Sequence, residues 1–294
     1  MSETASQRRT GIALVIAAAV AWSTAPFFTK LLPLDSWTIL FWRGLFGGAA
    51  ISVILILTQG SAGLRDFIYM GRNGWLVASL STLGMIAFIP SLQLTSVSNV
   101  AIIIATGPFV AAAIAWIWLR ERLRARTLLA MLVAFCGVII IVGGAGGGSD
   151  KLGIALACFM IIVISVMTVV VRRHKGTPMV AAAALSNLLG SVISLPFAQG
   201  IPGVTATELG TLAMFGFCQV GLGLSLFVLG SRYLPSGQAT LIGTLETPLM
   251  PFWVWLAFRE MPSDRALFGG VLVLSAVVAD IIGDHRAQKN LSPT

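Results

Sequence analysis

Long apolar runs separated by short polar linkers occupy most of the chain between residues 11 and 283. A helix needs about 20 mostly apolar residues to cross a bilayer core of about 30 Å. The runs are too continuous for the alternating pattern of barrel strands, so helices are expected. The pattern predicts ten membrane-spanning helices, at about 11–33, 36–58, 73–94, 97–119, 126–144, 152–172, 178–199, 208–231, 235–258 and 265–283.

The second half of this pattern repeats the first. Similar residues recur at a nearly constant spacing, in the pairs Gly11-Ile12-Ala13-Leu14 and Gly153-Ile154-Ala155-Leu156, Ser23 and Ser165, Pro108 and Pro248, and Glu121 and Glu260. The halves, 1–148 and 149–294, meet at a glycine run and each holds five predicted spans. Since five is odd, tandem copies must insert in opposite orientations. The expected fold is an all-α integral membrane protein, two inverted five-helix repeats around a central cavity.

Composition agrees with lipid as the solvent. Of the 294 residues, 57% are hydrophobic and 10% are charged, whereas a soluble domain has roughly 25% charged residues. Fourteen of the nineteen Lys and Arg residues fall on the side of the predicted N-terminus and four on the other. This bias predicts a multi-pass protein of the bacterial inner membrane with both termini in the cytoplasm. Basic loops facing anionic lipids explain the net charge of +8 without a nucleic-acid partner.

The first span has one alternative interpretation. Arg8 and Arg9 precede an apolar stretch, as in an export signal that is later removed. The apolar run, however, continues through Phe27-Phe28, and a related segment recurs in mid-chain, where no signal peptide can lie. We therefore interpret this segment as a membrane span.

Several chemistries lack their sequence signatures. The three cysteines lie inside apolar runs, and no metal-ligand spacing occurs, so neither a disulfide framework nor a metal or other cofactor is predicted. No HExxH or GxSxG motif and no phosphate-binding loop is present, which argues against an enzyme and against direct use of ATP. A gradient of solute or protons is the expected energy source.

Motifs in both halves carry a family resemblance. They are Phe41-Trp42-Arg43-Gly44, the stretch 92–101, Gly107-Pro108, Trp118-Leu119-Arg120-Glu121, the stretch 232–239, Thr247-Pro248 and Glu260. Through these residues nearly the whole chain resembles the EamA-type branch of the drug/metabolite transporter superfamily, and within it the bacterial aromatic amino acid exporters. The resemblance implies a basket of ten helices that exports aromatic and other neutral amino acids from the cytoplasm.

Two charged residues fall inside predicted spans, where ionisable groups are costly and point to function. Glu246, between Thr244 and Thr247, is a candidate for binding a substrate ammonium or for carrying a proton. Arg43 is a candidate for binding a carboxylate or for guarding an outer gate. The alternative is a buried Arg43–Glu246 ion pair that locks the two halves together.

Other polar and aromatic residues in the spans are candidates for lining the cavity. The residues assigned to substrate binding, beside Glu246 and Arg43, are Trp22, Ser23, Phe88, Asn99, Thr106, Ser165, Gln219 and Thr244, and Phe227 is a further aromatic candidate for the wall. Serine and threonine also bond their own helix, and aromatic rings also pack in cores, so each has a structural alternative. Gly44 and Gly48 form a GxxxG step that predicts close helix packing.

Prolines within the spans predict interruptions. Pro26, Pro90, Pro108, Pro248 and Pro251 each remove a backbone donor. Pro108 and Pro248 occupy equivalent places in the two halves, and with Pro26 they are candidate hinges for alternating access. The alternative is a set of fixed bends that shape the bundle.

These observations favour a secondary transporter. We expect a monomer in the lipid bilayer that exports amino acids, with proton coupling as an option. A transporter of other metabolites or of lipophilic cationic drugs is the nearest alternative, because Glu246 beside aromatic rings also suits a cation. A passive channel is the alternative from another class.

Overall fold

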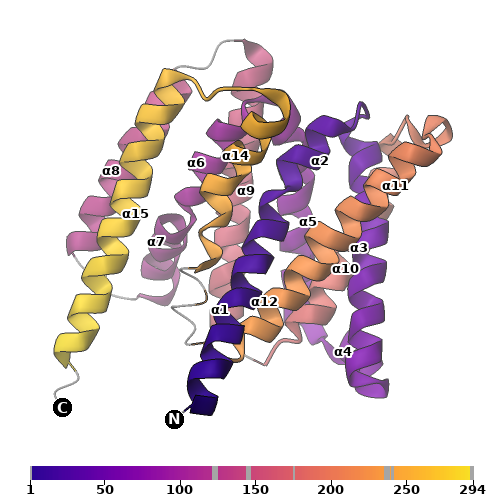
Figure 1. The fold of residues 1–294 in the computed structure, drawn as a ribbon, viewed down its shortest axis with the longest axis horizontal. Helices are drawn as coiled ribbons and strands as arrows, with labels where there is room; N and C mark the ends of the chain where they lie inside the picture. Colours follow the sequence, from indigo (N-terminus) through magenta and orange to yellow (C-terminus); the bar gives the residue numbers. More distant parts are fainter. Residues whose placement is uncertain are drawn as a thin grey trace.

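A computed structural model describes residues 2–120, 125–143, 147–174, 176–234, 239 and 242–291. Over these residues the chain is a bundle of helices without strands (Figure 1). The start of the ninth predicted span, Glu121 of the predicted repeat and the middle of the glycine run lie outside the described residues. The expected all-helical class is confirmed.

The helices follow the predicted order. The first part of the chain contains α1 (Ser2–Ser23), α2 (Ala25–Leu31), α3 (Ser36–Gln59), α4 (Ser61–Tyr69), α5 (Gly71–Leu94), α6 (Val97–Ala105), α7 (Gly107–Leu119) and α8 (Ala125–Gly143). The second part contains α9 (Gly148–Arg173), α10 (Met179–Ser194), α11 (Ala206–Met214), the π-helix η3 (Phe215–Leu222), α12 (Gly223–Ser231), α14 (Glu246–Phe258) and α15 (Asp264–Leu291), with 3₁₀ turns η1 (Leu195–Phe197) and η2 (Ile201–Gly203) after α10.

Seven helical segments of the described chain are long and apolar enough to cross a membrane. They are Gln7–Leu31, Ser36–Gln59, Gly71–Leu94, Val97–Leu119, Gly148–Arg173, Met179–Phe197 and Ala206–Ser231, which match seven of the ten predicted spans. The other three predicted spans contain α8, α14 and α15. There α8 supplies a shorter apolar helix, Thr127–Ile140, and α14 has 13 residues.

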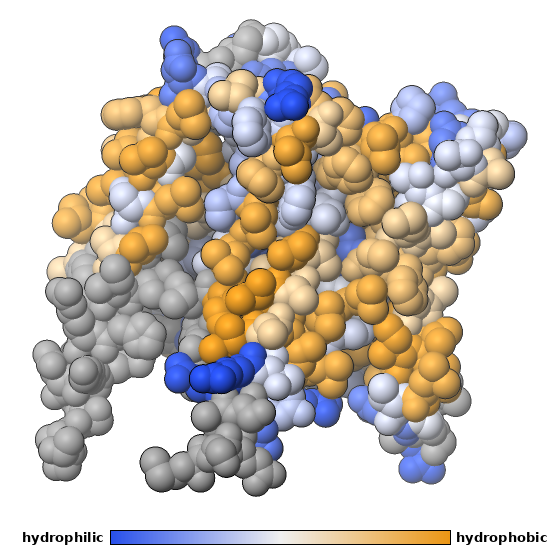
Figure 2. All heavy atoms as spheres, in the orientation of Figure 1, coloured by the Kyte–Doolittle hydropathy of each residue, from blue (hydrophilic) through white to orange (hydrophobic). Residues whose placement is uncertain are grey.

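Large apolar side chains cover much of the molecule's outside. Leu57 is 79% exposed and Ile117 is 74% exposed, as are many other aliphatic and aromatic residues to a lesser degree. Figure 2 shows hydrophobic residues over the middle of the visible face and hydrophilic ones gathered toward its ends. Such an extensive apolar surface is unfavourable in water but favourable in the hydrocarbon interior of a bilayer. The chain is therefore a multi-pass membrane protein.

Three helices are interrupted where the sequence places a proline just beyond the break. The turn at Thr24 precedes Pro26, the turn at Thr106 precedes Pro108, and the turn at Thr244 and Leu245 precedes Pro248. A proline offers no N–H to the carbonyl four residues earlier, so the helix before it can end without losing that bond. Interruption was predicted wrongly at Pro90 and Pro251, because α5 and α14 continue through them.

The helices pack in pairs that join the two parts of the chain. The pairs that pack most extensively are α5 with α9, α3 with α10, α8 with α15, and α1 with α12. α7 packs on α9, and α1 and α2 pack on α14. α1 begins and α15 ends at the same end of the bundle, while α2 lies toward the opposite end (Figure 1).

The predicted GxxxG contact is confirmed between α3 and α10. A β-carbon on Gly44 would lie 2.6 Å from the carbonyl oxygen of Asn187, and one on Gly48 would lie 2.7 Å from the Leu188 side chain. The two backbones therefore approach more closely than any side chain at Gly44 allows.

Asp35 starts α3 as its N-cap. Its carboxylate accepts hydrogen bonds from the backbone N–H groups of Trp37 and Thr38, both at 3.0 Å, and from the Thr38 hydroxyl at 2.6 Å. Burial on its own raises the pKa of Asp35, but these hydrogen bonds outweigh it, so the pKa lies below its ordinary value.

Replacing this cap is expected to destabilise the protein in a pH-dependent way. Asp35→Ala should cost about 1 kcal/mol at neutral pH, the usual value of an N-cap. Because the folded pKa is depressed, the stabilisation is present above the ordinary Asp pKa of about 4 and is lost as the pH falls through the folded pKa. Thermal unfolding in detergent should show the variant and wild type converging in acid. Asp66→Ala, inside α4 and not at an N-cap, is the control and should lower the unfolding midpoint less at neutral pH.

Candidate functional site

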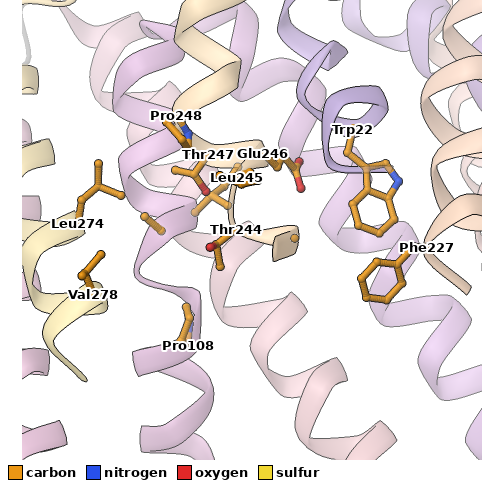
Figure 3. A pocket seen from close by; sticks show the side chains of 13 residues that line it. Trp22, Pro108, Phe227, Thr244, Leu245, Glu246, Thr247, Pro248, Leu274 and Val278 are labelled. Atoms are coloured by element: carbon orange, nitrogen blue, oxygen red, sulfur yellow. The ribbon is translucent and has the colours of Figure 1, made fainter. Parts of the chain in front are cut away.

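A cavity of about 480 Å³ lies where the broken helices meet (Figure 3). Its wall combines the end of α1, the α6–α7 break, α12, the segment before α14 and the middle of α15. The lining residues are Trp22, Ile104, Ala105, Pro108, Phe227, Gly243, Thr244, Leu245, Glu246, Thr247, Pro248, Leu274 and Val278.

Glu246 is the one ionisable side chain among these lining residues. It is the first residue of α14, directly after the turn at Thr244 and Leu245. In Figure 3 its carboxylate extends toward the side of the cavity where Trp22 and Phe227 lie. Within the described part of the chain, no group hydrogen-bonds or ion-pairs with this carboxylate. A carboxylate in an apolar wall without a partner is costly, which makes Glu246 the leading candidate for a binding group.

Two aromatic rings form the wall beside Glu246. The ring centroids of Trp22 and Phe227 are 5.1 Å apart, with the planes tilted by 41°. Gly223 allows the indole to lie flat against α12, because a β-carbon there would approach the Trp22 Nε1 to 2.5 Å. The site therefore offers a carboxyl group and two aromatic rings.

The backbone of Trp22 is held from η3. Pro26 has no N–H to offer the carbonyl of Trp22, four residues earlier. The side-chain amide of Gln219 donates to that carbonyl at 3.5 Å. Gln219 lies in the π-helix, whose wider turn changes the direction in which side chains point.

Arg43 lies behind this contact and not in the cavity wall. Its Nη2 donates to the Gln219 Oε1 at 2.7 Å, its Nη1 contacts the Met85 sulfur at 3.3 Å, and the guanidinium carbon lies 5.0 Å from the centre of the Phe215 ring. Arg43 is 4% exposed, and its Nε has no hydrogen-bond partner. The Arg43–Glu246 pair considered from the sequence is not formed. Arg43 instead joins α3, α5 and η3 through neutral partners.

A line of three contacts joins α1–α2 to α14 beside the cavity. The Trp253 indole donates to the Ser23 hydroxyl at 2.8 Å, and the rings of Phe27 and Phe258 lie 6.0 Å apart. Beyond them Lys30 and Glu260 form an ion pair, the one found in the described chain. We call these contacts the α2–α14 seam. It ends at the end of the bundle opposite to the start of α1 (Figure 1).

Four other predicted site residues lie away from the cavity wall. Asn99 donates to the Thr95 hydroxyl at 3.0 Å, Thr106 to the carbonyl of Ile103 at 2.7 Å, and Ser165 to the carbonyl of Gly107 at 3.4 Å. Phe88 packs against core side chains. The structure therefore brings together Trp22, Thr244 and Glu246, with Pro108 and Pro248, and Gln219 supports them from behind.

Some lining residues were not assigned to substrate binding from the sequence. Phe227, an aromatic candidate for the wall from the sequence, does line the cavity. Leu274 and Val278 stood in the sequence as ordinary aliphatic residues. Their chemistry carries no signal of a site. Only the helix arrangement identifies them.

Two segments of the chain, residues 9–143 and 151–279, match the model of the EamA-like transporter family. No curated protein matches the chain by sequence. A solved structure titled only "Crystal structure of protein" is similar to it with a TM-score of 0.65 and 17% identity, over 92% of this chain and 97% of that one. That likeness shows a shared fold. The two family matches together cover most of the sequence, and the chain therefore belongs to the EamA-like transporter family.

Proposed function

We propose that this protein is a secondary transporter that carries small amine-bearing molecules outward across the bacterial inner membrane by alternating access at the Glu246 cavity. Neutral amino acids, aromatic ones in particular, are the candidates that the sequence suggests. The observation that carries the proposal is the unpartnered Glu246 carboxylate beside the Trp22 and Phe227 rings. A substrate ammonium would pair with the carboxylate, and an aromatic or aliphatic side chain would lie against the rings.

Two inverted five-helix halves, divided at 1–148 and 149–294, form the architecture of this proposal. The packing pairs support it. If each helix is replaced by its counterpart in the other half, the α1–α12 pair becomes the α9–α5 pair, and the pairs α3–α10 and α8–α15 each become themselves. The aligned serines support it as well. Ser23 bonds α14 through Trp253, and Ser165 bonds the carbonyl at the start of α7. The two family matches fall one within each half.

Alternating access requires one side of the cavity to open while the other closes. With both termini in the cytoplasm, the α2–α14 seam lies on the outer side and is closed in this structure. The helix breaks at Thr24 and at Thr244 and Leu245 lie at the cavity end of this seam, where α2 and α14 can turn without breaking a continuous helix. Pro26, Pro108 and Pro248 are the proposed hinges.

Weakening the seam is expected to favour the outward-open state. Trp253→Phe removes the hydrogen bond to Ser23, and a net value of about 1 kcal/mol for such a bond corresponds to a shift of about fivefold between the two states. Labelling from the outside of a cysteine that replaces Thr244 in the cavity wall should accelerate by about that factor. Trp255→Phe on the same helix is the matched control and should leave the labelling rate unchanged.

Transport by purified protein tests the function itself. Proteoliposomes preloaded with unlabelled aromatic amino acid or amine should take up the labelled compound faster than empty liposomes. Repeating the assay with and without a pH gradient shows whether protons are coupled. If no amino acid or amine enters under either condition, the proposed function is wrong.

A further inference from the structure

We infer that the cavity takes organic amines that lack a carboxylate in preference to the zwitterionic amino acids that carry the same ring. This inference rests on the proposed function and narrows its substrate class.

Charge is the first argument. Glu246 places an acid in the wall, and no lysine or arginine stands among the lining residues that the structure describes. A carboxylate on the substrate would leave water for an apolar space that already contains an acid. Such burial without a counter-charge is costly, and a neighbouring like charge adds to the cost.

Arg43 does not supply the missing counter-charge. Its guanidinium is bonded to Gln219 and Met85 and lies against Phe215, and the residue is 4% exposed. A substrate carboxylate could reach it only if the Gln219 contact parted, and Gln219 also supports the Trp22 carbonyl. Lys30, the cation of the neighbouring α2, is paired with Glu260 in the seam.

The start of α14 is the remaining attraction for an anion. A helix N-terminus carries a partial positive charge and often binds carboxylates. Glu246 lies in this first turn, so an acid already occupies the position that favours an anion. Pro248, two residues later, has no N–H to donate. The local field is therefore compensated before any substrate enters.

The aromatic wall suits the other half of the expected ligand. An ammonium on a short alkyl chain can pair with Glu246 while a ring contacts Trp22 and Phe227, which lie 5.1 Å apart. The cavity volume of about 480 Å³ falls in the range of small-ligand pockets, about 300–1,000 Å³. Aromatic monoamines thus match the charge, the wall and the size.

Pairs of compounds that differ only by the carboxylate test this inference. Uptake of labelled tyramine and tyrosine, and of tryptamine and tryptophan, is measured in proteoliposomes holding the full-length wild-type protein. We expect at least tenfold higher transport efficiency for the amine of each pair. Equal or better transport of the amino acids would overturn the inference while leaving the proposed function intact. Uptake of neither member would contradict both.

Variants show which residue sets the preference for amines over amino acids. Glu246→Gln should reduce the preference for the amine to less than threefold, with folding checked by gel filtration in detergent. Arg43→Lys should change the two rates of each pair by the same factor, since Arg43 touches neither compound. A selective loss of amino acid transport in Arg43→Lys would show that Arg43 binds the carboxylate, and would overturn the inference.

Discussion

Glu246→Gln is expected to lower substrate uptake by at least 100-fold while the amount of folded protein in the membrane stays unchanged. Among the lining residues that the structure describes, Glu246 is the one that is ionisable, and no described group pairs with it. Glutamine keeps the size of the side chain and removes the charge. Hydrogen bonds to charged groups contribute about 1.5–3 kcal/mol, and the loss of direct charge pairing in an apolar wall adds to that. Initial uptake rates in proteoliposomes measure the effect.

A surface glutamate provides the matched control for this change. Glu208 caps the start of α11 together with Thr205 and lies outside the cavity. Glu208→Gln makes the same chemical replacement and should leave uptake within twofold of wild type. Glu246→Asp keeps the charge on a shorter side chain and should retain part of the activity. Normal uptake by Glu246→Gln would remove Glu246 from the transport site.

Gly44→Ala is expected to destabilise the protein strongly for so small a change. The added methyl would lie 2.6 Å from the carbonyl oxygen of Asn187 and 3.1 Å from the backbone nitrogen of Ser191. Both neighbours belong to the backbone of α10 and cannot move as a side-chain end can. Overpacking of this kind costs about 1–3 kcal/mol, and α3 and α10 also join the two halves. A lower midpoint of thermal unfolding in detergent is the measurement.

The control for Gly44 is a helical glycine with open space around it. Gly210 lies in α11, and a β-carbon there would meet nothing within 4 Å. Alanine is the better helix former by about 1 kcal/mol, so Gly210→Ala should be neutral or slightly stabilising. If Gly44→Ala were equally harmless, the close approach of α3 and α10 would be wrong.

The sequence predicted the helical class and several local features because these follow from short-range physics. An apolar run of about 20 residues has few structural options in lipid. Pro26, Pro108 and Pro248 each follow a helix break, since a missing N–H acts within one turn. The close packing at Gly44 and Gly48 could be predicted because small residues four positions apart lie on one face of a helix. The same reasoning failed at Pro90 and Pro251, where the surrounding helix continues.

The partner of Arg43 was not predictable, because it depends on how helices are rotated against one another. Arg43 bonds Gln219, 176 positions later in the chain, and Gln219 lies in a π-helix. The wider π turn has no signature in the pattern of apolar residues, which follows the ordinary helix. The sequence therefore offered Glu246, the other charged residue inside a predicted span, as the partner.

The candidate site was predictable in part. Glu246, Thr244 and Trp22 were candidates because charge and polarity stand out in a membrane span, and the structure places them around one cavity. Thr106 and Ser165 carry the same signal but bond backbone carbonyls. A hydroxyl that bonds the backbone looks the same in sequence as one that faces a cavity. Whether any of these residues binds substrate remains a prediction.

Labelling of a single cysteine in the cavity tests alternating access most directly. Thr244→Cys is made in a protein whose Cys136, Cys158 and Cys218 are replaced by serine. A membrane-impermeant maleimide is applied to right-side-out and to inside-out vesicles. We predict that Cys labelling occurs from both sides and that saturating transported substrate slows it from both. Labelling from neither side, or labelling that a transported substrate does not affect, would contradict the account.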